Sequence, residues 1–124
     1  MKRRILLIDD DADVRSVVKL CLEMSQDWFV QAASSGMEGC AIAAHHPFDA
    51  ILLDVMMPDL DGIATLERLR QQPQTQTVPV IFLTAKDPTE YEVFQGYDVQ
   101  GVLSKLIEPL QFAAQVATLL DWPL

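Results

Sequence analysis

The chain has few basic residues. It contains 9 lysines and arginines against 18 aspartates and glutamates in 124 residues, so its formal net charge is −9. Proteins that bind nucleic acids use basic side chains to neutralise phosphates, and helices that bind anionic lipid need the same sign of charge. We therefore expect no nucleic acid and no membrane among the partners of this chain.

Long hydrophobic runs and paired cysteines are also lacking. No segment approaches the ~20 apolar residues of a membrane span, and the apolar run after the basic N-terminus is too short for a signal peptide. The two cysteines, Cys21 and Cys40, match no metal-ligand spacing and are predicted to be reduced core residues. No Gly/Ser linker divides the chain. We expect one domain over residues 1–124, without an output domain, in the cytoplasm.

Five apolar segments of strand length alternate with helical patterns. Residues 4–8, 48–54 and 78–84 are nearly continuous in apolar character, which is typical of strands covered on both faces, and residues 28–33 and 101–104 are weaker candidates. A short, weakly amphipathic helix is expected from Thr89 to about Gln95. Elsewhere, helical spacing is shown by Val14, Val17, Val18, Cys21 and Leu22, by Met37, Cys40, Ala41 and Ala44, by Ile63, Leu66 and Leu69, and by Leu110, Ala113, Ala114, Val116, Ala117 and Leu120, with Pro109 in the first turn.

A βα unit repeated five times predicts an α/β fold. The sheet would be parallel and five-stranded, with helices on both faces in a three-layer α/β/α arrangement. Right-handed crossovers restrict the topology, and the common doubly wound order is 2-1-3-4-5, as in flavodoxin. In that order the ligand crevice lies between strands 1 and 3 at their carboxyl ends. Acidic clusters follow the first and third predicted strands here, which favours this order.

Five polar side chains would meet at that edge of the sheet. Asp9 and Asp10 follow the first strand, Asp54 ends the third, Thr84 ends the fourth and Lys105 follows the fifth. Taken singly, an Asp after a strand is usually a turn or N-cap residue, and a lone Lys is usually a solvated charge. Their convergence at one edge is much harder to explain by chance. It predicts a functional site.

The residue types at this edge indicate phosphoryl chemistry with a divalent cation. Clustered carboxylates tolerate one another when a cation neutralises them, and an open, oxygen-only site suits Mg²⁺, with Mn²⁺ as an alternative ion. A carboxylate beside such an ion can accept a phosphoryl group as an acyl phosphate. The ion and Lys105 would offset charge on the phosphoryl oxygens, and Thr84 could donate a hydrogen bond to one of them.

Neither a calcium loop nor a flavodoxin-type phosphate site accounts for the acidic residues. A calcium loop beginning at Asp9 would need Gly at its sixth position and Glu at its twelfth, where this chain has Val14 and Leu20. Flavodoxins bind a phosphate after strand 1, which the acids here would repel. The segment 59–62 is interpreted as a turn before the third helix, with Asp61 or Gly62 at its cap, and His45 and His46 as loop residues.

The order of these motifs resembles the receiver domain of bacterial two-component response regulators, the CheY-like fold. The stretch LLDVMMPDLDG over residues 52–62 is similar to the phosphorylation-site signature of that family, and the resemblance covers essentially the whole chain. It implies that Asp54 is the phosphoacceptor and that Asp10 binds Mg²⁺ directly, with Asp9 acting mainly through bound water. The backbone carbonyl of Met56 would complete the protein ligands, and Thr84 and Lys105 would bind the phosphoryl oxygens.

The resemblance also implies partners. The phosphodonor would be a phosphohistidine on a sensor histidine kinase or a phosphotransfer protein, and the output would be phosphorylation-dependent binding of an unknown downstream protein. The surface formed by helix 4, strand 5 and helix 5 is the expected place for a homodimer. Such a protein is no enzyme in the ordinary sense, since it catalyses only its own phosphorylation and dephosphorylation.

The chain departs from the family pattern near its C-terminus. Lys105 is followed by Leu106 and Ile107 instead of Pro and Phe, and the switch position three residues earlier holds Val102 instead of an aromatic residue. A cis bond before a non-proline residue costs about 2.5–4 kcal/mol, so we expect either a trans bond with a shifted loop or a strained cis bond. The alternative function is a receiver-like interaction module that binds partners independently of phosphorylation.

Overall fold

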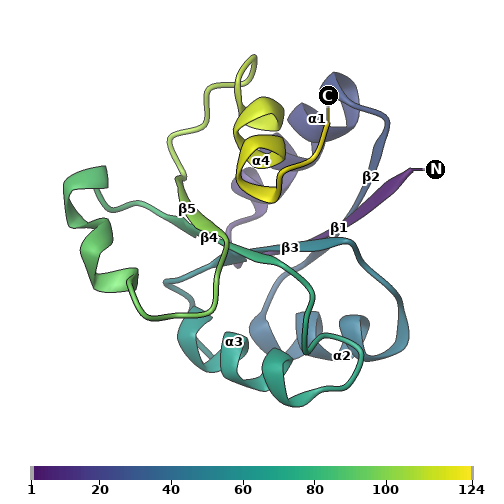
Figure 1. Cartoon of the computed structure of the whole chain (residues 1–124), viewed down its shortest axis with the longest axis vertical. Coiled ribbons are helices and arrows are strands. Elements are labelled where there is room, and N and C mark those ends of the chain that lie inside the picture. The colour runs from purple at the N-terminus through teal and green to yellow at the C-terminus, as the bar shows by residue number, and fades with distance from the viewer. Residues whose placement is uncertain (1, 124) are drawn as a thin grey trace.

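Five parallel strands form the centre of the computed structural model, which describes residues 2–123. They are β1 (Arg3–Ile8), β2 (Trp28–Ala33), β3 (Ala50–Asp54), β4 (Val80–Thr84) and β5 (Gly101–Ser104). Their order in the sheet is β2-β1-β3-β4-β5, with every neighbouring pair parallel (Figure 1). The predicted fold class and strand order are confirmed.

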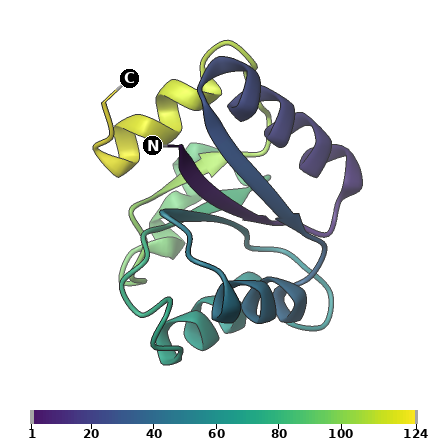
Figure 2. The ribbon, with the colours of Figure 1, turned by 90° about the vertical axis from the view of Figure 1, so that its right-hand side faces the viewer.

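Helices cover both faces of this sheet (Figures 1 and 2). Helices α1 (Ala12–Ser25) and α4 (Phe112–Leu120) pack on one face, and α2 (Gly36–His45) and α3 (Gly62–Gln71) pack on the other. Successive residues of a strand point to opposite faces, so Ile5 and Leu7 join the first core and Leu6 and Ile8 join the second. The continuous apolar character of β1 is therefore the result of burial on both sides.

Two strands begin later than the sequence pattern predicts. The third was expected from residue 48 and the fourth from residue 78, but they begin at Ala50 and Val80. Pro79 has no N–H and cannot donate to a ladder. Before β3, the Asp49 carboxylate accepts a hydrogen bond from the backbone N–H of Arg4 at 2.7 Å, so a side chain takes the place of a ladder partner.

The fourth expected helix is a 3₁₀ helix, η1 (Pro88–Phe94), and the last helix begins later than predicted. Only Phe94 of η1 is buried, so little apolar packing holds this segment in a regular α-helix. Pro109 and Leu110 lie in a turn whose N–H groups from Gln111 and Phe112 share the Glu108 carbonyl. Leu110 is 98% exposed. Both residues were wrongly assigned to the last helix.

The buried face of α2 also differs from the prediction. Met37 is 61% exposed, whereas Gly39, Cys40 and Ala43 are buried. A Cβ on Gly39 would lie 2.3 Å from Cδ1 of Ile8, so the absence of a side chain lets α2 approach the sheet closely. The interpretation of both cysteines is confirmed, since Cys21 and Cys40 are buried free thiols.

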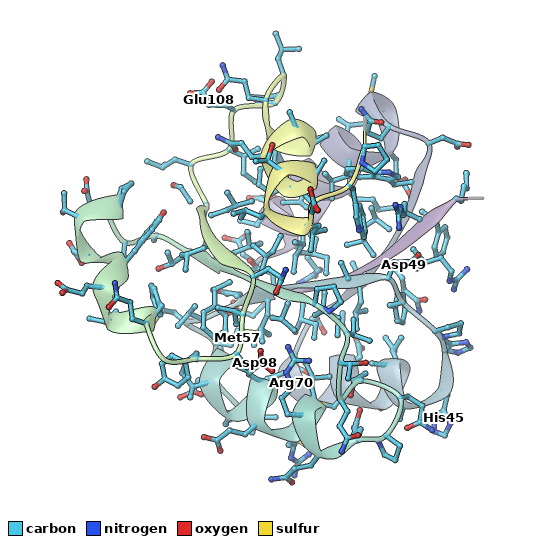
Figure 3. All side chains as sticks on the ribbon, in the orientation of Figure 1. His45, Asp49, Met57, Arg70, Asp98 and Glu108 are labelled. Atoms are coloured by element: carbon cyan, nitrogen blue, oxygen red, sulfur yellow. The ribbon has the colours of Figure 1, made fainter. Side chains whose placement is uncertain are left out.

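Arg70, near the end of α3, holds the segment that leads into β5. Its guanidinium donates hydrogen bonds to the carbonyls of Thr75 and Val78, and its Nε lies 3.0 Å from the Asp98 carboxylate. Figure 3 shows Arg70 and Asp98 next to each other between α3 and the loop before β5. Arg70 thus links the segment before β5, and with it Lys105, to the helical layer that contains α2 and α3.

Helix α4 ends on a strained residue, which leads to a stability prediction. Asp121 has φ 58 and ψ 40, and the N–H of Trp122 bonds back to the Ala117 carbonyl at 2.8 Å. Glycine prefers this conformation, and a negative charge is unfavourable at a helix C-terminus. Asp121→Gly is expected to raise the free energy of unfolding by about 1 kcal/mol in urea denaturation. Asp121→Asn, which removes the charge and keeps a side chain of the same shape, should give less.

Candidate functional site

The carboxyl ends of the strands bring the predicted side chains together. Ile8 pairs with Leu53, Asp54 with Leu83 and Thr84 with Ser104, so the residues at or just after these strand ends share one edge of the sheet. Carboxylate oxygens of Asp9, Asp10 and Asp54 lie within 4.8 Å of one another. In the part of the chain that the structure describes, this is the only cluster of three such groups.

Asp9 and Asp54 are fully buried, while Asp10 is exposed. The ammonium group of Lys105 lies between the two buried carboxylates, 3.1 Å from Asp54 Oδ2 and 3.2 Å from Asp9 Oδ2. Neither of these two oxygens has a hydrogen bond of good geometry within residues 2–123. The cluster thus holds three carboxylates and one ammonium, which contacts two of them, and the site keeps an excess of negative charge.

The local electrostatics show the cost of this arrangement. The pKa of Asp54 is raised to about 7, because burial and the nearby Asp9 carboxylate raise it by more than Lys105 and the Met56 N–H lower it. Burial alone would lower the pKa of Lys105, but its contacts with Asp54 and Asp9 outweigh burial and raise it. Asp54 ionises reluctantly unless more positive charge is brought to the site.

The donor set fits a hard divalent cation. All of its ligand atoms are oxygens, two of them are buried without a hydrogen-bond partner, and the exposed Asp10 keeps the site open to solvent. Mg²⁺ prefers such oxygen ligands and retains several waters. The residues present therefore suit the ion predicted from the sequence.

Short turns orient the buried side chains. Asp9 Oδ1 accepts from the Asp11 N–H at 2.8 Å, and Asp54 Oδ1 accepts from the Met56 N–H at 3.1 Å. The hydroxyl oxygen of Thr84, which is 1% exposed, accepts from the Lys86 N–H at 3.0 Å. Each site residue at a strand end is thereby fixed by the backbone that follows it.

Lys105 reaches the site without a proline after it. The Lys105–Leu106 peptide bond is trans. The Lys105 N–H donates to the Thr84 carbonyl at 2.9 Å, and the Leu106 N–H donates to Ser104 Oγ at 2.9 Å, which holds the end of β5 beside β4. Of the two geometries expected from the sequence, the structure has the trans bond. Val102, at the expected switch position, is half-buried and packs against the core under α2 and α3.

Three further residues considered in the sequence analysis, Met56, Asp61 and His45, lie at different distances from this edge. Met56 lies two residues after Asp54 with its side chain 70% exposed. It lines a cavity of about 510 Å³ with Thr84, Lys86 and Glu90. Asp61 caps α3 by accepting from the Ala64 N–H at 2.8 Å, as predicted. His45 ends α2, and Figure 3 places it far from the strand ends that carry the acids.

Sequence reasoning missed the structural role of Gly62. A Cβ there would lie 2.4 Å from the Asp54 carbonyl oxygen and 2.6 Å from the Val55 Cα. This glycine lets α3 begin directly against the backbone of Asp54. The only available signal was a glycine immediately after a capping aspartate, and such a glycine is usually interpreted as part of a turn.

Gly62→Ala is expected to destabilise the protein and displace Asp54. The added Cβ meets backbone atoms, which cannot rotate away, so we expect a loss of about 1–3 kcal/mol in the free energy of unfolding. Denaturant titration checks the loss. Gly96→Ala is the matched control, since no atom lies within 4 Å of the added Cβ and only its φ of +93 opposes the change. A Gly62→Ala protein as stable as wild type would contradict this account.

Comparison with known proteins identifies the family to which this chain belongs. The family model for the response regulator receiver domain matches residues 5–117. The chain belongs to the receiver domain family. Its Asp9, Asp10 and Asp54 form the acidic cluster at which receiver domains bind Mg²⁺, and membership implies a phosphoacceptor role in two-component signalling.

Curated relatives of this receiver domain are longer proteins. The response regulator Rre1 of Synechocystis sp. is 37% identical over 118 residues, which cover 94% of this chain and 51% of Rre1. The DNA-binding dual master transcriptional regulator RpaA of the same organism is 37% identical over 119 residues, covering 94% of this chain and 48% of RpaA. The receiver domain described here thus spans about half the length of these relatives.

Solved structures have the same fold. The chemotaxis response regulator CheY4 of Vibrio cholerae has a TM-score of 0.86 and 26% identity, covering 96% of this chain and 99% of its own. The receiver domain of a sensor histidine kinase from Pseudomonas aeruginosa, solved with a magnesium ion coordinated in its active-site cleft, has a TM-score of 0.84 and 24% identity, covering 98% of this chain and 99% of its own. No helix within residues 2–123 of the receiver domain is long and apolar enough to cross a membrane.

Proposed function

We propose that this receiver domain is a phosphorylation switch in which Asp54 accepts a phosphoryl group from a phosphohistidine. The donor is a sensor histidine kinase or a phosphotransfer protein. The observation that carries the proposal is the buried Asp54 carboxylate, held beside a lysine ammonium and two further carboxylates. An aspartate with only a structural role would not be expected beside so many charged groups in the core, because burial of unpaired charge costs free energy.

The transfer requires Asp54 to act as the nucleophile. One Asp54 carboxylate oxygen bonds to phosphorus while the bond between phosphorus and the donor imidazole nitrogen breaks. The electron pair of that bond stays on the nitrogen. The Met56 N–H orients the carboxylate through Oδ1, which leaves Oδ2 free of directional bonds for the attack. The product is an acyl phosphate, which hydrolysis later removes.

Lys105 and Thr84 bind the phosphoryl oxygens in this proposal. The Lys105 ammonium already contacts Asp54 Oδ2 and can follow negative charge as it moves onto the phosphoryl group. Thr84 is buried at the end of the neighbouring strand, and its hydroxyl hydrogen remains free to donate because the oxygen only accepts from Lys86. Mg²⁺ would be held by Asp10, Asp54 and the Met56 carbonyl, with Asp9 through water, and would neutralise charge on the phosphoryl oxygens.

The test is phosphoryl uptake from a small donor. The purified protein is incubated with acetyl phosphate and Mg²⁺, and intact mass is measured. We expect a gain of one phosphoryl group that Asp54→Asn abolishes. Asp61→Asn is the matched control, because it changes a nearby carboxylate that caps α3 and retains a side-chain oxygen. No uptake from acetyl phosphate or from a histidine kinase would overturn the proposal.

Phosphorylation would signal by changing which proteins bind. We propose a cytoplasmic switch whose output is docking of a downstream protein, with a second copy docking on the surface of η1, β5 and α4 as one form of that output. The alternative, a binding module indifferent to phosphorylation, was suggested by the altered residues after Lys105. The position of the Lys105 ammonium between Asp9 and Asp54 favours the switch. If phosphorylated wild type and Asp54→Ala bind a partner with equal affinity, the result would favour the module.

The phosphorylated state is expected to last for minutes or longer. Loss of the phosphoryl group needs a water molecule oriented for attack, usually by a carboxylate or amide near the site. Met56 and Lys86, which line the cavity beside Thr84, supply neither. The two acids of that cavity are engaged elsewhere, since Asp87 accepts from Thr89 and Glu90 pairs with Lys86 at 3.5 Å. A half-life of seconds in purified protein would contradict this prediction.

A further inference from the structure

Strand β2 is one of the two edges of the sheet, so half of its backbone groups point away from β1. The Ala33 carbonyl accepts a hydrogen bond from the Asp9 N–H and therefore faces the β1 side. Backbone direction alternates along a strand, which turns the N–H and C=O of Val30 and Ala32 outward. Such a row of outward groups is a template on which another strand can add.

Two side chains of α1 cover the outward groups of Val30. The Lys19 ammonium donates to the Val30 carbonyl at 2.7 Å, and the Val30 N–H donates to Glu23 Oε2 at 3.0 Å. Lys19 and Glu23 are also paired with each other at 3.1 Å. Val30 is 0% exposed although it lies on an edge strand. One ion pair thus satisfies the donor and the acceptor that an added strand would need at this position.

The sequence of β2 explains why an uncapped edge would favour self-association. The strand reads WFVQAA, with five apolar residues in six, no charge and no proline. Short uncharged segments with high β-propensity are those that pair readily with copies of themselves. A second copy of this chain offers the identical edge, so two β2 strands related by a two-fold axis could exchange hydrogen bonds.

We propose that the Lys19–Glu23 pair is an edge cap that prevents β2 from pairing with β2 of a second copy. The cap keeps the receiver domain from associating through the side of the sheet farthest from β5. The inference is independent of the proposed phosphorylation of Asp54, since neither Lys19 nor Glu23 belongs to the acidic site.

The first measurement needs no substitution. Amide hydrogen exchange of the wild-type monomer compares Val30 with Ala32, which also points outward and to which no side chain within residues 2–123 is hydrogen-bonded. We expect exchange at Val30 to be slower by at least about tenfold. Equal exchange at the two amides would overturn the proposal.

The second measurement removes the cap. Lys19→Ala/Glu23→Ala is compared by sedimentation velocity with Lys86→Ala/Glu90→Ala, which deletes another ion pair at i,i+4 spacing and leaves the net charge unchanged in the same way. We expect the first variant alone to dimerise, with an association constant at least about tenfold above wild type. A monomeric first variant with a native circular dichroism spectrum, or equal association of both variants, would overturn the proposal.

A rescue variant separates strand pairing from general destabilisation. Adding Ala32→Pro to the uncapped protein removes an outward N–H that the β1–β2 ladder does not use. We expect this protein to return to the monomer. Association that persists in the triple variant would show that the contact is not made through the β2 edge and would overturn the proposal.

Discussion

Lys105→Ala is expected to reduce the rate of phosphoryl uptake by roughly 10²–10³-fold, the usual effect of removing a charge-stabilising donor from a transfer site. Lys105 is the cation that contacts Asp54 in the described structure, at 3.1 Å from Oδ2, and its side chain is only 17% exposed. Burial makes its interaction with charge on the phosphoryl group stronger than it would be in water.

The measurement is the rate of mass gain with acetyl phosphate at saturating Mg²⁺. Lys2→Ala is the control, because Lys2 pairs with the exposed Asp27 at 3.4 Å and lies outside the acidic site. Lys105→Ala should also bind Mg²⁺ more tightly, since a competing positive charge is removed from Asp9 and Asp54. Slow uptake together with retained Mg²⁺ binding separates loss of catalysis from loss of the fold. An unchanged rate would show that Lys105 does not bind the phosphoryl group.

Asp54→Asn is expected to stabilise the protein in the absence of divalent cations. The folded-state pKa of Asp54 is raised from 3.8 to about 7, so the folded protein binds this proton more tightly than the unfolded chain does. The free energy of unfolding therefore falls as the pH rises from about 4 to 7. The asparagine variant avoids this loss and should be more stable by about 4 kcal/mol at pH 8, with no gain below pH 4.

Mg²⁺ should narrow the difference in stability between the two proteins. Binding to the folded state stabilises it by RT ln(1 + [L]/Kd), which is about 2.7 kcal/mol at a hundredfold excess over Kd. The wild type should gain this amount and Asp54→Asn much less, because one anionic ligand is lost. Urea denaturation with Mg²⁺ or with a chelator measures both effects. Asp10→Asn is the control for burial, since Asp10 is exposed and its neutralisation should stabilise the metal-free protein less. If Asp54→Asn and wild type are equally stable at pH 8 in the presence of the chelator, the prediction is contradicted.

Parts of the structure were accessible from the sequence because they depend on local patterns. β2 and β5 have the predicted bounds, 28–33 and 101–104, although they were the weaker strand candidates. The cap of α1 follows a local rule too: Asp11 accepts from the Asp13 and Val14 N–H groups, and aspartate is among the residues that helix N-termini favour. Asp9 and Asp54 follow apolar strands, and the parallel topology alone takes them to the same edge.

Several features depended on packing that periodicity does not encode. Leu110 matched the helical spacing of α4 but is 98% exposed, because the Glu108 turn delays the start of the helix until Phe112. In α2 the close approach permitted by Gly39 buries Ala43 and leaves Met37 outside, although Met37 is the larger apolar residue. The segment from Pro88 to Phe94 buries only its last residue and stays a 3₁₀ helix.

The sequence by itself determined the chemistry of the site: three carboxylates, a hydroxyl and an ammonium carried by the ends of parallel strands. It also determined the family, because these residues occur in a recognisable order. Only the tertiary structure decided that the Lys105 ammonium lies between Asp9 and Asp54 without a following proline, and that Lys19 and Glu23 cover the edge of β2. Contacts between distant residues, such as Asp9 and Lys105, 96 positions apart, depend on how whole layers pack, and local sequence patterns do not encode that packing.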